Sequence, residues 1–206
     1  MGKASRLRFA IIALIALAIA GASRLRAQNE TIPPEVAALF EDIADIDKLR
    51  VLNPLKLTSE QIDKLIQLIN KSKRAYDSAL AAAAAPPIRS IAKDIKETRR
   101  RMLEGASIPT DLDNKVKQLQ DSFVKKREDQ DVNTLKSMSD EATKILTPSQ
   151  KSKAVSLARK ALSRDNKPAA QGDDDKFFNF YVMSVFIKYP RIIPLLEDMK
   201  RSASAG

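Results

Sequence analysis

Cysteine and histidine are absent from this chain of 206 residues, and glycine occurs only five times. Without cysteine, no disulfide bond can form and no thiol can act as a nucleophile. Without histidine, the chain lacks the most common general base and the usual zinc ligand. It also has no glycine-rich phosphate loop and no Gly-x-Ser-x-Gly motif. The sequence therefore predicts that the protein is not an enzyme, with no catalytic residue, no metal site and no cofactor.

Carboxylates do occur in runs, at Glu41-Asp42 and Asp173-Asp174-Asp175. The first pair falls on the polar side of an expected helix and the triplet falls in a polar linker, so both are expected to be solvated. The triplet also lacks the alternating ligand spacing of a calcium loop.

The N-terminus predicts an export signal. Three basic residues precede the apolar run Phe9–Ala22, which ends in the small-residue cleavage pattern Ala20-Gly21-Ala22. We expect cleavage after Ala22, with Ala27 as the alternative end. An uncleaved membrane anchor is disfavoured, because the run is shorter than the about 20 residues that a spanning helix needs. The mature protein is thus expected to be periplasmic or otherwise exported.

The chain is basic, with a formal net charge of +10 that falls to +7 when residues 1–22 and their three positive charges are removed. Export argues against nucleic acid as a partner. The positive charge favours acidic membrane surfaces, envelope polymers, and acidic or unfolded polypeptides.

Apolar residues recur at spacings of three and four along most of the chain, which predicts an all-α protein. The expected helices lie between Pro34 and Asn53, from Thr58 to Pro86-Pro87, from Ile88 to near Gly105, from Thr110 to Ile145, and after Leu146-Thr147. The long fourth helix is apolar at both ends but polar from Lys125 to Thr134. This polar waist predicts two separate packing contacts, or a coiled coil that is interrupted there.

The segment Phe177–Tyr189 contains the only concentration of aromatic residues. As a helix it would be apolar on nearly every side, so it must be buried, pair with a partner, or lie at a membrane surface. Burial in the protein's own core is the more common explanation. Pro190 and Pro194 are expected to break the chain beyond Tyr189, and residues 201–206 are expected to be disordered. The candidate partner-docking residues are Phe177, Phe178, Phe180, Tyr181 and Phe186.

The expected organisation is an elongated or curved helical hairpin or bundle with an extra N-terminal helix and an aromatic C-terminal helix. Its parts are the signal peptide (1–22), an N-terminal segment and helix (23–52), the main helical domain (53–164), a linker (165–175), and the aromatic helix with its tail (176–206).

A five-residue pattern, Leu-Thr-x-x-Gln, occurs twice in the main domain. A threonine that precedes a helix can accept hydrogen bonds from the free N–H groups of the first turn, and a glutamine three residues later can bond back to it. Each copy therefore predicts a capping box at the start of a helix. The motif residues are Leu57, Thr58 and Gln61 in the first copy, and Leu146, Thr147 and Gln150 in the second.

The export signal, the basic helical body, the lack of cysteine and the two motifs together resemble the Spy/CpxP-like periplasmic proteins, which are recognised by LTxxQ repeats. The resemblance covers about residues 53–165. It implies a thin, curved helical cradle, usually an antiparallel homodimer, whose concave face binds unfolding proteins without ATP. Some relatives sense envelope stress or metals, but this chain lacks the histidines that metal-responsive relatives use.

We therefore expect an exported, ATP-independent, chaperone-like protein that binds unfolded or partly folded envelope polypeptides. The alternative is a structural or regulatory envelope-stress adaptor that docks on a membrane or on a sensor protein. An enzyme subunit is the least favoured function.

Overall fold

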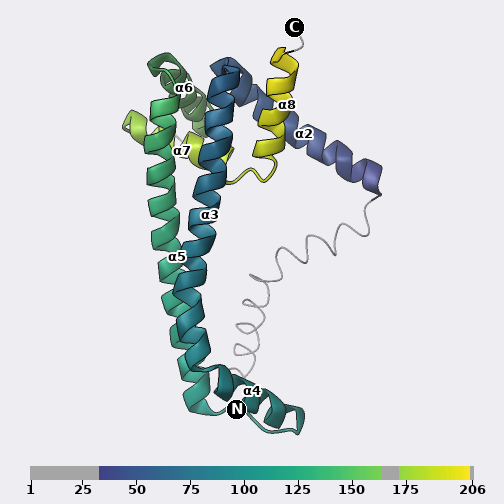
Figure 1. Ribbon diagram of the computed structural model, residues 1–206, viewed down its shortest axis with the longest axis vertical. Helices are drawn as coiled ribbons and strands as arrows, with labels where there is room; N and C mark the ends of the chain where they lie inside the picture. Colours follow the sequence, from purple (N-terminus) through teal and green to yellow (C-terminus); the bar gives the residue numbers. More distant parts are fainter. Residues whose placement is uncertain (1–32, 164–171, 205–206) are drawn as a thin grey trace. The chain divides into compact units, whose positions relative to one another are not determined.

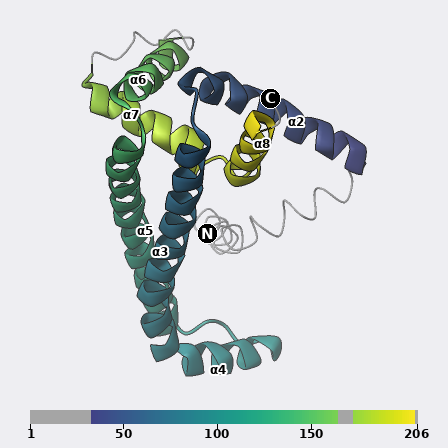
Figure 2. The same ribbon diagram turned by 45° about the horizontal axis from the view of Figure 1, so that its top comes forward.

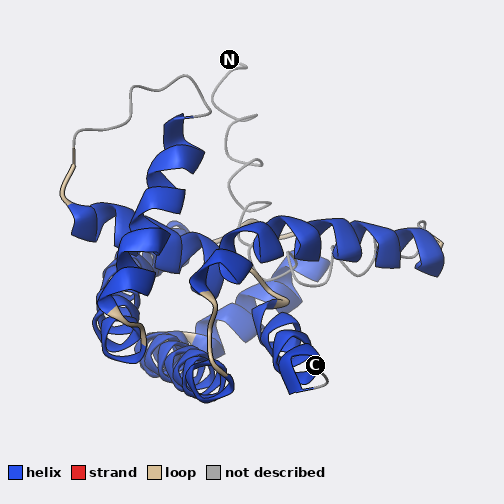
Figure 3. Cartoon of the chain, turned by 90° about the horizontal axis from the view of Figure 1, so that it is seen from above, coloured by secondary structure: helices blue, strands red, loops and turns tan. Residues whose placement is uncertain are grey.

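The computed structural model describes residues 33–163 and 172–204, and the chain divides into two compact units, residues 1–50 and 51–206. The described residues form helices and no strand (Figure 3), which confirms the all-α class. The predicted signal peptide lies outside the described residues. No helix in the described part of the chain is both long and apolar enough to cross a membrane.

The described part of the first unit belongs to helix α2 (Pro34–Leu52), which confirms the predicted helix before Asn53. Its first turn carries Glu35, where a negative charge interacts favourably with the helix dipole. The apolar side chains of α2 are largely exposed, including Leu39, Phe40 and Ile43.

The second unit is built on a helical hairpin of α3 (Ser59–Ser90) and α5 (Thr110–Ile145), here called the arm. The two helices run side by side, and α4 (Ala92–Leu103) lies crosswise at the end of the arm where the chain turns back (Figures 1 and 2). We call this end of the arm, with α4, the tip. With 32 residues, α3 is about 48 Å long. The bounds of α5 agree with the predicted helix from Thr110 to Ile145.

The polar waist of α5 separates two packing contacts, in agreement with the sequence-based prediction. The buried residues of α5 lie near its two ends: Leu112 at one end, and Met138, Ser139 and Ala142 at the other. Between them, residues 121–129 are exposed. One contact at the waist involves Tyr76 of α3, whose hydroxyl pKa is raised by burial and by the Asp131 carboxylate.

The predicted helix stop at Pro86-Pro87 is wrong, because α3 continues through both prolines to Ser90. Each proline removes one backbone hydrogen bond. Both lie within the last five residues of the helix, so the two lost bonds, to the carbonyls of residues 82 and 83, are confined to its C-terminal end. The alanine run 81–85 just before them strongly favours the helical conformation. Consequently α4 begins at Ala92 and not at Ile88.

At the other end of the arm, three helices and a π-helical turn form what we call the head. Their bounds are α6 (Pro148–Ser163), α7 (Asp174–Val182), the π-helical turn η2 (Met183–Ile187) and α8 (Ile192–Ser204). Helix α7 packs on α5 and α6, and α8 packs on α3. In Figures 1 and 2, α6, α7 and α8 gather at the end of the arm opposite α4.

The aromatic segment folds back into this head. Phe177, Phe178, Tyr181 and Phe186 are each at most 3% exposed, and Tyr181 packs edge-on against Phe186. These four candidate docking residues are therefore core residues, because α7 and η2 have neighbouring helices to pack against. Only Phe180, 39% exposed, remains at the surface.

Aspartates at the start of α7 hold it against α6. Asp173 caps the helix by accepting from the backbone N–H of Asp175 at 3.3 Å. The Asp174 carboxylate pairs with Arg159 at 2.6 Å, and the Asp175 carboxylate pairs with Lys151 at 2.9 Å. The three aspartates are exposed, as expected of a solvated triplet. Helix α7 nevertheless begins at Asp174, two residues before the predicted aromatic helix at residue 176, so the end of the predicted linker is helical.

The C-terminal helix departs from the sequence prediction in two places. Pro194 does not break it but lies in the first turn of α8, where its missing N–H costs nothing. Residues 201–204, expected to be disordered, are helical. The Lys200 ammonium contacts both carboxylate oxygens of Asp63, at 2.6 and 2.7 Å, which joins α8 to α3.

Tyr181 yields a test of this packing. Its hydroxyl donates to the carbonyl oxygen of Val51 at 2.8 Å, and burial raises its pKa well above the ordinary value of 10.0. Because the neutral form is favoured in the fold, its stabilisation is present below pH 10 and is lost as the pH rises above 10. We expect Tyr181→Phe to lower the free energy of unfolding by about 1 kcal/mol at pH 7. Above pH 10 the difference from the parent protein should shrink, and chemical denaturation at several pH values measures it. A constant difference across that range would contradict the burial of this hydroxyl.

Candidate functional site

Both Leu-Thr-x-x-Gln motifs form the predicted capping boxes. In the first, the backbone N–H of Gln61 donates to Thr58 Oγ1 at 3.2 Å, and the backbone N–H of Thr58 donates to Gln61 Oε1 at 3.1 Å. In the second, the equivalent bonds join Gln150 and Thr147 at 3.3 and 2.8 Å. The first box opens α3 and the second opens α6.

The two boxes also bind each other, which the sequence did not reveal. Gln61 Nε2 donates to Gln150 Oε1 at 2.8 Å, and Gln150 Nε2 donates to Gln61 Oε1 at 3.0 Å. Each amide uses its second N–H on the backbone next to the opposite box. Gln61 donates to the Ile145 carbonyl at 2.9 Å, and Gln150 donates to the Leu55 carbonyl at 2.9 Å.

Each glutamine therefore uses its full hydrogen-bonding capacity, because an amide has two donors and an oxygen that accepts two bonds. Each oxygen accepts one bond from its own capping box and one from the opposite amide. The leucines that open the motifs lie beside this pair, with Leu146 buried and Leu57 half-buried. We call this arrangement the paired boxes. It joins residues that are 89 positions apart in the chain.

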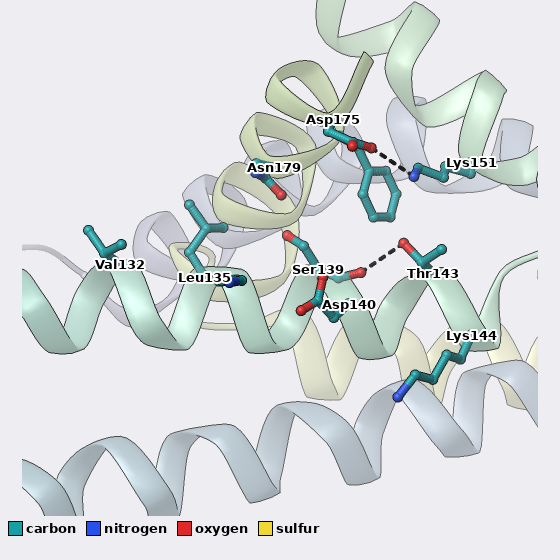
Figure 4. Close-up of a pocket in the computed structure, with 11 residues that line it drawn as sticks. Val132, Leu135, Ser139, Asp140, Thr143, Lys144, Lys151, Asp175 and Asn179 are labelled. Carbon is teal, nitrogen blue, oxygen red and sulfur yellow. Dashed lines mark hydrogen bonds and ion pairs between the residues drawn. The ribbon is translucent and has the colours of Figure 1, made fainter. Parts of the chain in front are cut away.

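An open groove of about 690 Å³ lies beside the second box, between α5, α6 and α7. Figure 4 shows Lys151 and Asp175 joined at its rim, on the opposite side from Ser139 and Thr143 of α5. Apolar side chains line its interior, and its rim carries charges of both signs. The lining residues are Val132, Leu135, Lys136, Ser139, Asp140, Thr143, Lys144, Lys151, Asp175, Phe178 and Asn179.

Ser139 is the unusual residue of this groove. It is only 5% exposed, and within the described part of the chain its hydroxyl has no hydrogen-bond partner. A buried polar group without a partner costs about 1–3 kcal/mol, and this hydroxyl is covered by protein atoms and is not open to the groove.

At one edge of the groove, packing fixes the position of a basic side chain, Lys151. The Lys151 ammonium lies 5.1 Å from the centre of the Phe178 ring and pairs with Asp175. Lys136 and Lys144 lie along α5, with Asp140 between them in sequence. This arrangement suits the binding of a mixed polar and apolar chain.

Sequence reasoning found the two boxes but missed the groove, because its residues come from three helices. One signal was available: Lys151 takes the place of the apolar residue that would complete a hydrophobic staple in the second box. A charged residue at that position indicated a contact outside the box itself. The lysine makes that contact with α7.

The paired boxes predict a large effect of losing one amide. Gln61→Ala or Gln150→Ala leaves several backbone and side-chain groups without partners, so we expect each to lower the free energy of unfolding by about 2–3 kcal/mol. Gln67→Ala, an exposed position on α3, is the matched control and should change it by less than about 0.5 kcal/mol. The two deletions should be strongly non-additive, because either one breaks the same pair. Additive losses in urea unfolding would contradict the pairing.

The threonines should have a smaller role. Thr58→Ala and Thr147→Ala each remove one N-cap, so we expect each to cost about 1 kcal/mol of stability. Binding of unfolded polypeptides should be unchanged when each variant is assayed at a lower temperature, at which it is as fully folded as the parent protein. If either variant lost binding while its circular dichroism spectrum stayed the same, the threonine would be a contact residue and not only a cap.

Comparison with family models, curated proteins and solved structures gives no match. The resemblance to the Spy/CpxP-like proteins therefore rests on the sequence features already described, above all the two motifs.

Proposed function

We propose that this protein is an exported, ATP-independent, chaperone-like protein that binds unfolded or partly folded acidic polypeptides in the groove beside the second box. The observation that carries the proposal is the groove's combination of an apolar lining with a rim of three basic and two acidic side chains. A non-native polypeptide exposes the matching groups, namely apolar side chains, carboxylates and free backbone N–H and C=O groups.

The apolar contribution comes from Val132 and Leu135 of α5. Val132 is 66% exposed, so a bound segment can cover a side chain that now faces water. An open groove of this kind excludes little and can accept many sequences, which suits weak and unselective binding of non-native chains.

The electrostatic contribution comes from Lys136, Lys144 and Lys151, of which Lys144 also pairs with Glu141 and Lys151 with Asp175. Together with the net charge of the whole chain, they would attract acidic polypeptides over distances of about 8–10 Å at physiological salt. Binding in this way needs no nucleotide, and release would follow when the client buries its own apolar side chains.

The structure weakens the alternative of an adaptor that docks through the aromatic segment. Four of its five candidate docking residues are buried in the head, so they offer no surface to a sensor or a membrane. Homodimer formation stays a prediction that solution measurements of mass can test.

A charge introduced into the groove tests the proposal. The assay measures how the chain that begins at Ser23 suppresses aggregation of reduced α-lactalbumin, an acidic client. We expect Val132→Glu to raise the protein concentration needed to suppress aggregation at least fivefold. The substitution places a negative charge where the client would bury apolar and acidic groups.

The matched control is Val124→Glu, the same substitution on the same helix. Val124 is 54% exposed and lies outside the groove. It should leave suppression within twofold of the parent protein. If both variants weakened suppression equally, or if the parent protein did not suppress aggregation, the groove would not be the client site.

A further inference from the structure

The tip carries an amphipathic surface that the proposed chaperone function does not use. Helix α4 contains five basic residues and two acidic ones, and Arg89 precedes it on the last turn of α3. Its apolar side chains are nevertheless exposed: Leu103 by 75%, Met102 by 44% and Ile95 by 39%. None of the residues of α4 is buried.

An ion pair fixes which side of α4 faces the arm. Asp94 lies 3.8 Å from the Lys115 ammonium of α5, so the side of α4 that carries Asp94 is turned toward the arm. Successive residues of a helix are rotated by about 100°, which places Leu103 about 180° from Asp94. Leu103 thus points away from the arm.

The basic residues flank that outward leucine. By the same geometry Arg99 lies about 140° from Asp94 and Lys96 about 200° from it, on either side of Leu103. The other acidic residue, Glu97, lies only about 60° from Asp94. The acidic side of α4 is therefore turned toward the arm, and the outward side combines Leu103 with positive groups. Ile95 and Met102 lie about 100° and 80° from Asp94, at the edge between the two sides.

Glu97 is also occupied. It pairs with Arg100 at 2.9 Å, and Arg100 contacts Glu104 at 2.8 Å as well. Arg100 is thus shared by two carboxylates, and neither Lys96 nor Arg99 takes part in these ion pairs.

We propose that the outward side of α4 binds the surface of a membrane that contains anionic phospholipids. A short helix with apolar residues on one side and flanking lysine and arginine is the type that lies in the headgroup region of a bilayer. Basic side chains next to such a surface each contribute to binding through the negative surface potential.

The shape of the tip favours a lipid surface over a polypeptide. Helix α4 is about 18 Å long and lies crosswise at the end of the arm, so its outward side can rest on a plane (Figures 1 and 2). The groove lies at the head end of α5, and no residue of α4 is buried. A convex helix suits a bilayer, whereas an extended peptide needs a groove or a sheet edge.

Binding here would hold the protein by the end of its arm and leave the groove and the head in water. It goes beyond the proposed chaperone function and does not depend on it. It also differs from a transmembrane anchor, since α4 would lie in the interface and would not cross the bilayer.

The experiment measures co-sedimentation of the chain that begins at Ser23, which keeps every described residue and lacks the apolar run of the predicted signal. The probes are vesicles of phosphatidylcholine alone and vesicles that also contain phosphatidylglycerol. We expect binding to the anionic vesicles only. Lys96→Gln combined with Arg99→Gln should lower the partition coefficient about 25-fold, since each charge contributes about fivefold. Leu103→Asn should lower it about tenfold.

The matched control is Lys153→Gln combined with Lys160→Gln, which removes the same charge from exposed positions of α6 in the head. It should change the partition coefficient by twofold at most. Because all substituted positions are exposed, unchanged thermal unfolding should confirm that each variant is folded.

Three results would overturn the proposal. The first is a parent protein that binds both vesicle types equally or binds neither of them. The second is an α6 control that weakens binding as much as the tip variants do, which would show a general effect of net charge. The third is a set of tip variants that keep vesicle binding but suppress α-lactalbumin aggregation less well, which would assign the tip to polypeptides.

Discussion

The reciprocal pairing of the Gln61 and Gln150 amides is the interaction on which the second unit depends. Each amide satisfies its own capping box and the backbone beside the other one. The start of α3 is thereby tied to the junction between α5 and α6. The leucines at the first position of the motifs place apolar atoms next to this polar cluster, where each unmade hydrogen bond is costly. One pair of side chains thus sets the position of three helices.

The head is built outward from that fixed point. Once the second box sets the start of α6, Lys151 and Arg159 extend from the same helix toward α7. Each cation pairs with an aspartate and lies over a phenylalanine ring, Lys151 over Phe178 at 5.1 Å and Arg159 over Phe177 at 4.1 Å. Tyr181 then closes the packing on the other side by bonding to the carbonyl of Val51, just before the first box. The first five residues of the aromatic segment are therefore held from two sides, by α6 and by the carbonyl of Val51.

The sequence predicted local features of the fold but not the contacts between residues that are far apart in the chain. The bounds of α5 and both capping boxes were predicted correctly, because apolar period, caps and turns act within a few residues. The stop at Pro86-Pro87 was wrong because a helix-forming run of alanines outweighed the loss of two hydrogen bonds near a helix end. The glutamine pair could not be predicted, since a capping box explains each glutamine fully and nothing local requires a partner 89 residues away. The burial of Phe178 likewise depends on α5 and α6, which lie beside it only in the folded chain.

The two ends of the arm differ in how firmly they are held. At the head, α3 and α5 are fixed by buried residues such as Leu65 and Ala142 and by the paired boxes. Toward the tip, burial is limited to Ile91 and Leu112, each 7–8% exposed, and the waist of α5 is solvated. Segments with few buried contacts open at lower free energy than the core of the same protein. The tip can therefore adjust to what it touches without disturbing the glutamine pair about 48 Å away along α3. The stabilising contacts of this hairpin are concentrated at one end. The head is therefore rigid and holds the groove, and the tip is more adaptable.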